Sequence, residues 1–220
     1  MTAETNMTTQ IPKIGDRAPD FQANSSKGPI SLKDYKGKWV ILFSHPADFT
    51  PVCTTEFIEF ARRYEEFEQR NAQLVGLSID SVYSHIAWLL QMEKIYGVEV
   101  KFPVIADLNM NVANLYGLIH ERASATSTVR AVFFIDPEGV VRALIYYPAS
   151  TGRNISEILR VLDSLTYADS FMIATPADWK AGDDVIVPQP ATLQAAKDRL
   201  KDKNLQVKDW FLAIKKSPKK

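Results

Sequence analysis

The stretch WVILFSHPADFTPVCTTE, residues 39–56, joins a predicted strand to a predicted helix and contains Cys53, the one cysteine of the 220-residue chain. Its first five residues form an apolar run with the length of a buried strand. Aromatic side chains then recur at helical spacing, at Phe57, Phe60, Tyr64 and Phe67. Pro51 suits the first positions of a helix, and Thr50 before it is a candidate N-cap. We therefore predict that Cys53 lies in the first turn of a helix that follows a buried strand.

The first turn of a helix favours negative charge. Its backbone N–H groups lack partners within the helix, and the helix dipole is positive there. A cysteine thiolate is such a charge, and neighbouring cations favour it further. A lone cysteine is also often only a small buried side chain. The position of Cys53 by itself therefore allows either a reactive or an inert thiol.

The surrounding motif favours the reactive alternative. Pro46, Thr50 and Cys53 form the pattern Pro-x-x-x-Thr-x-x-Cys, and the longer string over residues 44–56 resembles the active-site motif of single-cysteine peroxiredoxins. A match of this length at a strand-to-helix junction is specific. The resemblance extends over nearly the whole chain from about residue 11. It implies a thioredoxin-like α/β sandwich and a thiol-dependent peroxidase.

The same resemblance assigns roles to individual residues. It makes Cys53 the nucleophile, Thr50 a hydroxyl donor to peroxide or thiolate, and Pro46 a cover that limits access to the sulfur. Arg130 matches the second active-site position of the family. Its alternative is a surface arginine at the end of a strand.

Three further residues are expected around this site. By resemblance, Glu56 pairs with the active-site arginine, and Arg153, in a Gly-Arg-Asn string, lies nearby. The alternative for both is an ordinary surface residue with weak exposed contacts. His45 either forms a hydrogen bond near the cysteine or packs at the end of the strand. His85 and His120 are expected to be structural or solvated.

The rest of the first 170 residues reads as alternating strands and helices. Beyond the strand at 39–44 and the Cys53 helix, we expect hairpins at 20–32 and 130–146 and strands at 74–79 and 102–106. Helices are expected at 84–96, 107–116 and 156–167. The helix at 84–96 is expected to turn Ile86, Leu89, Leu90 and Ile95 to the core and to stop at Gly97. This order agrees with the thioredoxin-like sandwich that the resemblance implies.

We divide the chain into a flexible N-terminus (1–10), a peroxidase domain (11–170) and a small α+β extension (171–220). The extension is rich in proline and contains a predicted helix at 192–203. It is expected to expose three large aromatic side chains, Trp179, Trp210 and Phe211, that mark an interface. By resemblance, the extension covers the Cys53 cleft of a second subunit, which implies a homodimer or a ring of dimers. The alternative is an extension folded back on its own domain.

Composition excludes several functions. Lys+Arg and Asp+Glu number 26 each, so no net field recruits nucleic acid or an anionic membrane. No apolar run has transmembrane length, and residues 1–10 lack the apolar core of a secretion signal. One cysteine fits a reducing compartment, so we expect a soluble, cytoplasmic protein. His45, His85, His120 and Cys53 show no metal-ligand spacing, and neither a metal nor a cofactor is expected.

The expected reaction is the reduction of hydrogen peroxide and alkyl hydroperoxides in antioxidant defence. Without a resolving cysteine, oxidised Cys53 needs an external thiol of the thioredoxin, glutaredoxin or glutathione type. A thioredoxin-like disulfide oxidoreductase is excluded, because it needs a second cysteine three residues after the first and Glu56 occupies that position. Some single-cysteine peroxiredoxins also have a phospholipase site built on a Gly-x-Ser-x-Gly-like sequence before the strand. In this chain Lys38 occupies the place of that serine, so a lipid-hydrolase site is unsupported. A chaperone role after over-oxidation remains an alternative.

Overall fold

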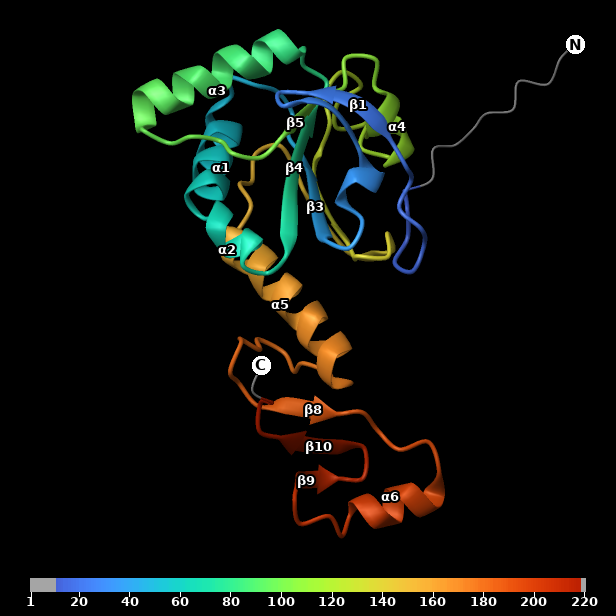
Figure 1. Ribbon diagram of the computed structural model, residues 1–220. Helices are drawn as coiled ribbons and strands as arrows, with labels where there is room; N and C mark the ends of the chain where they lie inside the picture. Colours follow the sequence, from blue (N-terminus) through green and yellow to red (C-terminus); the bar gives the residue numbers. More distant parts are fainter. Residues whose placement is uncertain (1–10, 219–220) are drawn as a thin grey trace, which may run out of the picture. The chain divides into compact units, whose positions relative to one another are not determined.

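The computed structural model describes residues 11–218, so the predicted flexible segment 1–10 lies outside the described residues. The chain forms two compact units, Met1–Ile155 and Ser156–Lys220 (Figure 1). Among the described residues, no helix is both long and apolar enough to cross a membrane.

A mixed seven-stranded sheet forms the centre of the first unit, with the strand order β2-β1-β5-β4-β3-β6-β7. Strand β3 (Trp39–Ser44) lies inside this sheet, where it pairs in parallel with β4 and antiparallel with β6. The other strands are β1 (Gln22–Ser25), β2 (Gly28–Ser31), β4 (Ala72–Ser78), β5 (Val104–Ala106), β6 (Arg130–Ile135) and β7 (Val141–Tyr147). Every residue of β3 and β6 is buried, and apart from Ser44 and Arg130 their sequences are the apolar runs typical of buried strands.

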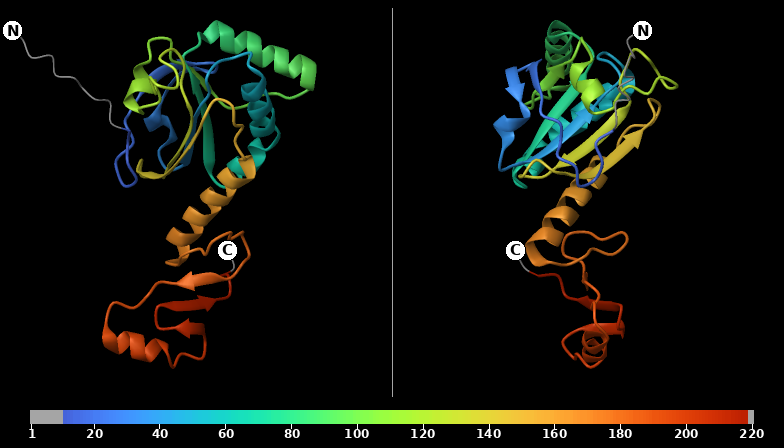
Figure 2. Two further views of the ribbon diagram at one scale, coloured as in Figure 1. Left: turned by 180° about the vertical axis from the view of Figure 1, so that it is seen from behind. Right: turned by 90° about the vertical axis from the view of Figure 1, so that its right-hand side faces the viewer.

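Alternate residues of β3 serve two cores, on opposite faces of the sheet. Val40 and Leu42 pack in the core that also holds residues of η1 (Leu32–Tyr35) and α4 (Asn111–Leu115). Phe43 points to the other face and stacks on Phe60 of α1 (Pro51–Arg62), with ring centroids 4.2 Å apart. Helices α2 (Tyr64–Glu68) and α3 (Val82–Tyr96) belong to this second side (Figures 1 and 2). The first unit is thus a three-layer α/β structure.

A glycine lets α1 approach the sheet closely. A Cβ added to Gly76, in the middle of β4, would lie 3.2 Å from the ring of Phe57 and 3.4 Å from the ring of Phe43. Phe57 is one helical turn beyond Cys53, so this close approach also sets the depth of the cysteine. A larger residue at position 76 would push the start of α1 outward.

The orientation predicted for the helix over 84–96 is wrong. Its buried side chains are His85, Trp88 and Met92, whereas Ile86, Leu90 and Ile95 are exposed. The helix carries apolar residues on more than one side, and a polar residue, His85, occupies the inner face because buried partners satisfy it. The predicted stop is confirmed, since Gly97 has a left-handed conformation with φ of 64°.

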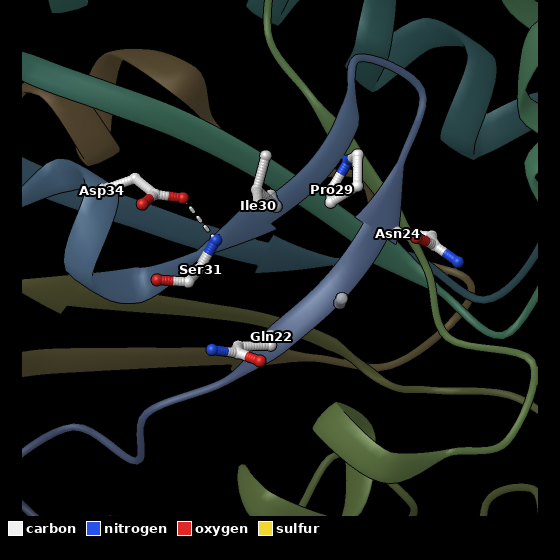
Figure 3. Close-up of a pocket in the computed structure, with 7 residues that line it drawn as sticks. Gln22, Asn24, Pro29, Ile30, Ser31 and Asp34 are labelled. Carbon is white, nitrogen blue, oxygen red and sulfur yellow. Dashed lines mark hydrogen bonds between the residues drawn. The ribbon is translucent and has the colours of Figure 1, made fainter.

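The predicted hairpin over 20–32 is present as β1 and β2, and Ser31 then begins the short helix η1. The Ser31 side chain accepts a hydrogen bond from Lys33 N, and Asp34 accepts one from Ser31 N at 2.6 Å. This reciprocal arrangement is a capping box. Figure 3 shows the bond between Asp34 and Ser31 N among the residues that line a hollow on the hairpin. None of the predicted site residues lines this hollow.

The second unit contains α5 (Ile155–Phe171), which begins at the boundary between the units, and a small antiparallel sheet in the order β8-β10-β9. The strands are β8 (Val185–Val187), β9 (Gln206–Asp209) and β10 (Leu212–Lys215), and α6 (Leu193–Arg199) precedes β9. These elements confirm the expected small α+β extension.

The prediction that Trp179 is exposed is wrong. Trp179 is 1% exposed and packs with Tyr167, Ile173 and Val185. Its indole Nε1 donates to the carbonyl of Asp183 at 3.1 Å, so the polar edge of the ring is satisfied within the same loop. Trp210 and Phe211 are exposed as predicted, at 43% and 54%. One aromatic residue therefore forms the core of this small unit, while the other two lie on its surface.

Candidate active site

Helix α1 begins at Pro51, so Cys53 lies in its first turn, as predicted. Thr50 occupies the N-cap position with an extended backbone, but its side chain does not cap the helix. The Thr50 hydroxyl instead donates to the carbonyl of Ala47 at 2.9 Å. Because the Thr50 side chain does not cap the helix, the backbone N–H groups of the first turn still favour an anion near Cys53.

Arg130 directly contacts the cysteine. Cys53 is 0% exposed, and Arg130 Nη1 donates to its Sγ at 3.3 Å. The antiparallel pairing of β6 with β3 sets Val132 opposite Phe43, which carries Arg130 past the carboxyl end of β3. Arg130 is 2% exposed, so the surface alternative for this residue is wrong. The side chain is further held by two hydrogen bonds from Nε and Nη2 to the carbonyl of Ala149, at 3.0 and 2.8 Å.

Glu56 joins Arg130 to a second arginine. It lies one turn after Cys53 on α1, and its Oε2 accepts from Arg130 Nη1 at 2.7 Å and from Arg153 Nη2 at 2.6 Å. Its Oε1 accepts from the backbone N and the Nε of Arg153, at 2.8 and 3.0 Å. The carboxylate is therefore fully satisfied although it is 3% exposed.

Arg153 fixes the cluster to the end of the sheet. Its Nη1 donates to the carbonyls of Ser44 and Ala131, at 2.9 and 3.1 Å, and its guanidinium lies 5.1 Å from the ring centroid of Phe43. The surface alternative for Arg153 and Glu56 is therefore also wrong. The two arginines and one glutamate carry a net charge of +1 next to Cys53, so a thiolate would bring this buried group to neutrality.

A second buried network lies next to this cluster. His45 directly follows β3, and its Nε2 lies 2.9 Å from Asp48 Oδ1, while His85 Nδ1 of α3 lies 2.8 Å from Asp48 Oδ2. Burial lowers the pKa of His45 and outweighs the opposing effect of Asp48. Burial alone would raise the pKa of Asp48, but hydrogen bonds and charges from both histidines hold it below its usual range.

The sequence did not indicate this network. Asp48 has no predicted role beyond its place in the motif string, and the prediction for His85 is a structural or solvated residue. His85 is 0% exposed, and no spacing in the sequence relates it to Asp48, 37 residues away. His120 lies apart from both clusters, stacked on Tyr146 with ring centroids 5.6 Å apart.

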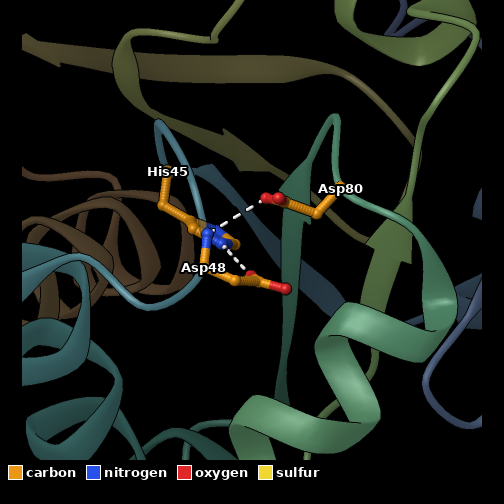
Figure 4. Close-up of side chains that lie close together, drawn as sticks. All are labelled: His45, Asp48 and Asp80. Carbon is orange, nitrogen blue, oxygen red and sulfur yellow. Dashed lines mark hydrogen bonds and ion pairs between the residues drawn. The ribbon is translucent and has the colours of Figure 1, made fainter.

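Potential metal ligands do come together among the described residues, in the group His45, Asp48 and Asp80 (Figure 4). Their nearest ligand atoms lie within 4.8 Å of one another. Hydrogen bonds already engage these groups: Asp80 Oδ2 accepts from Asp48 N at 3.0 Å and from Ser78 Oγ at 2.6 Å. This arrangement anchors the loop after β3, and the expectation of no metal stays a prediction.

Pro46 and Thr50 occupy that same loop, residues 45–50. Both are partly buried, and they lie between the His45–Asp48 network and the start of α1. The structure thus brings Cys53, Arg130, Glu56 and Arg153 into one hydrogen-bonded group and places Pro46 and Thr50 in the segment that leads to it.

Comparison with known proteins identifies both units. The model of the AhpC/TSA family matches residues 14–144, and that of the C-terminal domain of 1-Cys peroxiredoxin matches residues 164–203. A peroxiredoxin of Aquifex aeolicus is 51% identical over 217 residues, covering 94% of this chain and 97% of that protein. A peroxiredoxin of Methanosarcina mazei is 52% identical over 219 residues, covering 96% and 100%.

Solved structures agree. A yeast mitochondrial 1-Cys peroxiredoxin has a TM-score of 0.85 at 40% identity, over 94% of this chain and all of that one. A cysteine-to-serine mutant of peroxiredoxin 6 of Arenicola marina has a TM-score of 0.84 at 37% identity, over 94% and 99%. The predicted thioredoxin-like fold is confirmed, and fold and site together define a thiol peroxidase. The chain belongs to the peroxiredoxin family, in its 1-Cys class. It reduces peroxides through a single cysteine that an external thiol regenerates.

Proposed function

We propose that Cys53 is the peroxidatic nucleophile and that Arg130 is its principal partner. The thiolate sulfur attacks one peroxide oxygen, an S–O bond forms and the O–O bond breaks. The departing oxygen takes up a proton and leaves as water or an alcohol, and Cys53 becomes a sulfenic acid. The observation that carries this proposal is the 3.3 Å hydrogen bond from Arg130 to Sγ, in a buried group with one excess positive charge.

Arg130 serves the reaction in two ways in this proposal. Its fixed charge favours the thiolate, and its guanidinium faces the point where negative charge passes from sulfur to the departing oxygen. Glu56 and Arg153 hold it in place and prevent it from turning toward solvent. The loop residues complete the site: the Thr50 hydroxyl is the proposed donor to the peroxide, for which it gives up its bond to the Ala47 carbonyl, and Pro46 covers the sulfur. His45 borders the site through the network with Asp48.

Regeneration needs two equivalents of thiol. The first attacks the sulfenic sulfur, releases water and forms a mixed disulfide with Cys53, and the second releases the reduced cysteine. Thiol resolution in the yeast mitochondrial 1-Cys peroxiredoxin runs via glutathione/thioredoxin systems. For this chain we propose a donor of the thioredoxin, glutaredoxin or glutathione type, and hydrogen peroxide and alkyl hydroperoxides as substrates.

The test is steady-state turnover of hydrogen peroxide with each of these three donors in turn. We expect turnover with at least one donor and none with the Cys53→Ser variant, which is close in size to the parent. Turnover by Cys53→Ser, or no turnover with any dithiol or monothiol donor, would contradict the proposal. The same reactions with an alkyl hydroperoxide test the range of substrates.

For assembly, we propose a homodimer, with a ring of dimers as its further association, formed through the extension at 171–220. Exposed Trp210 and Phe211 support this, since adjacent large aromatic side chains on a small unit are typical of interfaces. Light scattering should show that replacing both by alanine lowers the mass of the full-length protein. Met172→Ala, at an 84% exposed position in the same unit, is the control. An unchanged mass in the double variant would refute this interface.

We place the protein in the cytoplasm, in line with its dependence on external thiols. The unpaired cysteine supports this, because a thiol that cycles through sulfenic acid needs a reducing compartment. Fractionation of the source cells would test this assignment, and recovery of the protein in an extracellular or membrane fraction would contradict it.

A further inference from the structure

His45, Asp48 and His85 form a buried relay that ends in a fixed backbone carbonyl. His85 Nε2 lies 3.0 Å from the carbonyl oxygen of Ile105 in β5, while its Nδ1 faces Asp48. All three side chains are almost fully buried, at 1% exposure or less. Asp48 therefore links the loop after β3 to α3 and, through His85, to β5.

The positions of the protons follow from the partners. A carbonyl oxygen only accepts hydrogen bonds, so His85 Nε2 must carry a proton. The other nitrogen of His85 faces an oxygen of Asp48. If Asp48 is ionised, that nitrogen also carries a proton, and the His85 ring is an imidazolium. This gives the buried carboxylate one cationic partner, the arrangement that burial of a charge requires.

The same reasoning determines which nitrogen of His45 carries a proton. His45 Nε2 donates to the Asp48 carboxylate, and a neutral ring then has no proton on Nδ1. His45 Nδ1 is buried and has no hydrogen-bond partner among the described residues. It is thus a free acceptor in a ring that packs on Phe57, one turn after Cys53, with centroids 4.8 Å apart.

We propose that His85 and Asp48 are positioning residues, which hold the 45–50 loop in place and keep His45 in the tautomer with its proton on Nε2. Asp48 anchors the loop at three points: its two carboxylate oxygens bind the two histidines, and its backbone N donates to Asp80. The proposal rests on the function proposed above, in which Pro46 and Thr50 of this loop act on the peroxide. The bare Nδ1 of His45 is then an acceptor that no described residue uses, in a ring that packs on the helix that contains Cys53.

The proton positions can be measured without any reaction. The probe is ¹⁵N NMR of the imidazole nitrogens in the reduced, full-length protein at neutral pH, with histidine labelled. The chain has three histidines, so single substitutions assign them. We expect two protonated nitrogens in His85, and a protonated Nε2 with a bare Nδ1 in His45. A neutral His85, or His45 with its proton on Nδ1, would overturn the proposal even if the protein is an active peroxidase.

Two substitutions separate the hydrogen bonds from the charges. In Asp48→Asn the amide oxygen still accepts from His45 and the amide NH₂ donates to His85, so every bond persists while His85 becomes neutral. His85→Leu removes both bonds of the ring. We expect His85→Leu to slow the oxidation of Cys53 by hydrogen peroxide by roughly 10- to 100-fold, the scale of a misplaced reacting group, and to perturb the His45 tautomer. Asp48→Asn should lower the rate less and keep that tautomer.

His120→Gln, outside both buried networks, is the matched control and should oxidise at the parental rate. A parental rate in His85→Leu would overturn the positioning role. A slow rate with an unchanged His45 tautomer would overturn its mechanism. Should His85→Leu fail to fold, the Asp48→Asn spectrum still decides: a doubly protonated His85 in that variant would contradict the proton accounting.

Discussion

Replacing Arg130 by lysine keeps the positive charge but removes the planar fork that the site uses. Arg130 points three ways at once, with hydrogen bonds to Cys53 Sγ, to Glu56 and to the carbonyl of Ala149. A lysine ammonium has one nitrogen on a flexible stem and cannot reach all three groups. In Arg130→Lys we therefore expect the ammonium to bind the Glu56 carboxylate, which leaves the sulfur and the Ala149 carbonyl without a donor.

The expected loss follows from these contacts. Removing one preorganised donor from a buried reaction centre lowers a rate by ~10²-fold, which corresponds to about 2.7 kcal/mol of barrier. Loss of the paired bonds to Ala149 costs about 2–3 kcal/mol of unfolding free energy, because hydrogen bonds to charged groups are the stronger kind. Glu56 keeps its bonds to Arg153, so the cluster should not collapse.

Stopped-flow fluorescence can follow this reaction under single-turnover conditions. Trp88 reports on the site, because its ring lies 4.7 Å from that of Phe57 and its Nε1 donates to Thr54, the neighbour of Cys53. The matched control is Arg142→Lys on β7, whose guanidinium binds Asp136 away from the site. An oxidation rate for Arg130→Lys within about twofold of the parent would show that Arg130 is peripheral and refute the reasoning.

Four other substitutions test the surrounding structure, each by urea denaturation. Glu56→Gln leaves two buried arginines without their anion and should lower the unfolding free energy by about 3–5 kcal/mol. Trp179→Ala should cost about 3–5 kcal/mol by opening a cavity in the second unit, whereas Trp210→Ala should cost much less. Because folding lowers the pKa of His45, the unfolded chain binds its proton first, so stability falls as pH drops below about 6.5, by up to about 1.4 kcal/mol per pH unit. His45→Gln should abolish that slope, and a variant that retains it would place the effect elsewhere.

Local sequence signals sufficed for the elements that carry the cysteine. The apolar run at 39–43 gives β3, and Pro51 marks the first residue of α1, because a strand and a helix start are determined by neighbours in the chain. The family resemblance also assigns Arg130 and Glu56 to the site. Which atoms they bind depends on the register of β6 against β3, and no local pattern encodes that register.

Residues outside such patterns were assigned wrongly or missed. The inner face of α3 contains His85 in place of the apolar residues expected there, because Asp48 and the Ile105 carbonyl satisfy both ring nitrogens. Trp179 is buried because its own loop folds over α5 and pairs the indole with Asp183. Both outcomes depend on hydrogen-bond partners distant in sequence or on loop geometry, and hydrophobic periodicity reports neither.

The most direct test of Cys53 as the reacting atom is a single-turnover oxidation followed by mass spectrometry. One equivalent of hydrogen peroxide is added to the reduced, full-length protein, and the product is trapped with a reagent specific for sulfenic acid. We predict one adduct, on the peptide that contains Cys53, that forms at the rate at which the fluorescence of Trp88 changes. Consumption of peroxide without a modified Cys53, or an adduct that appears much more slowly than peroxide disappears, would contradict the assignment.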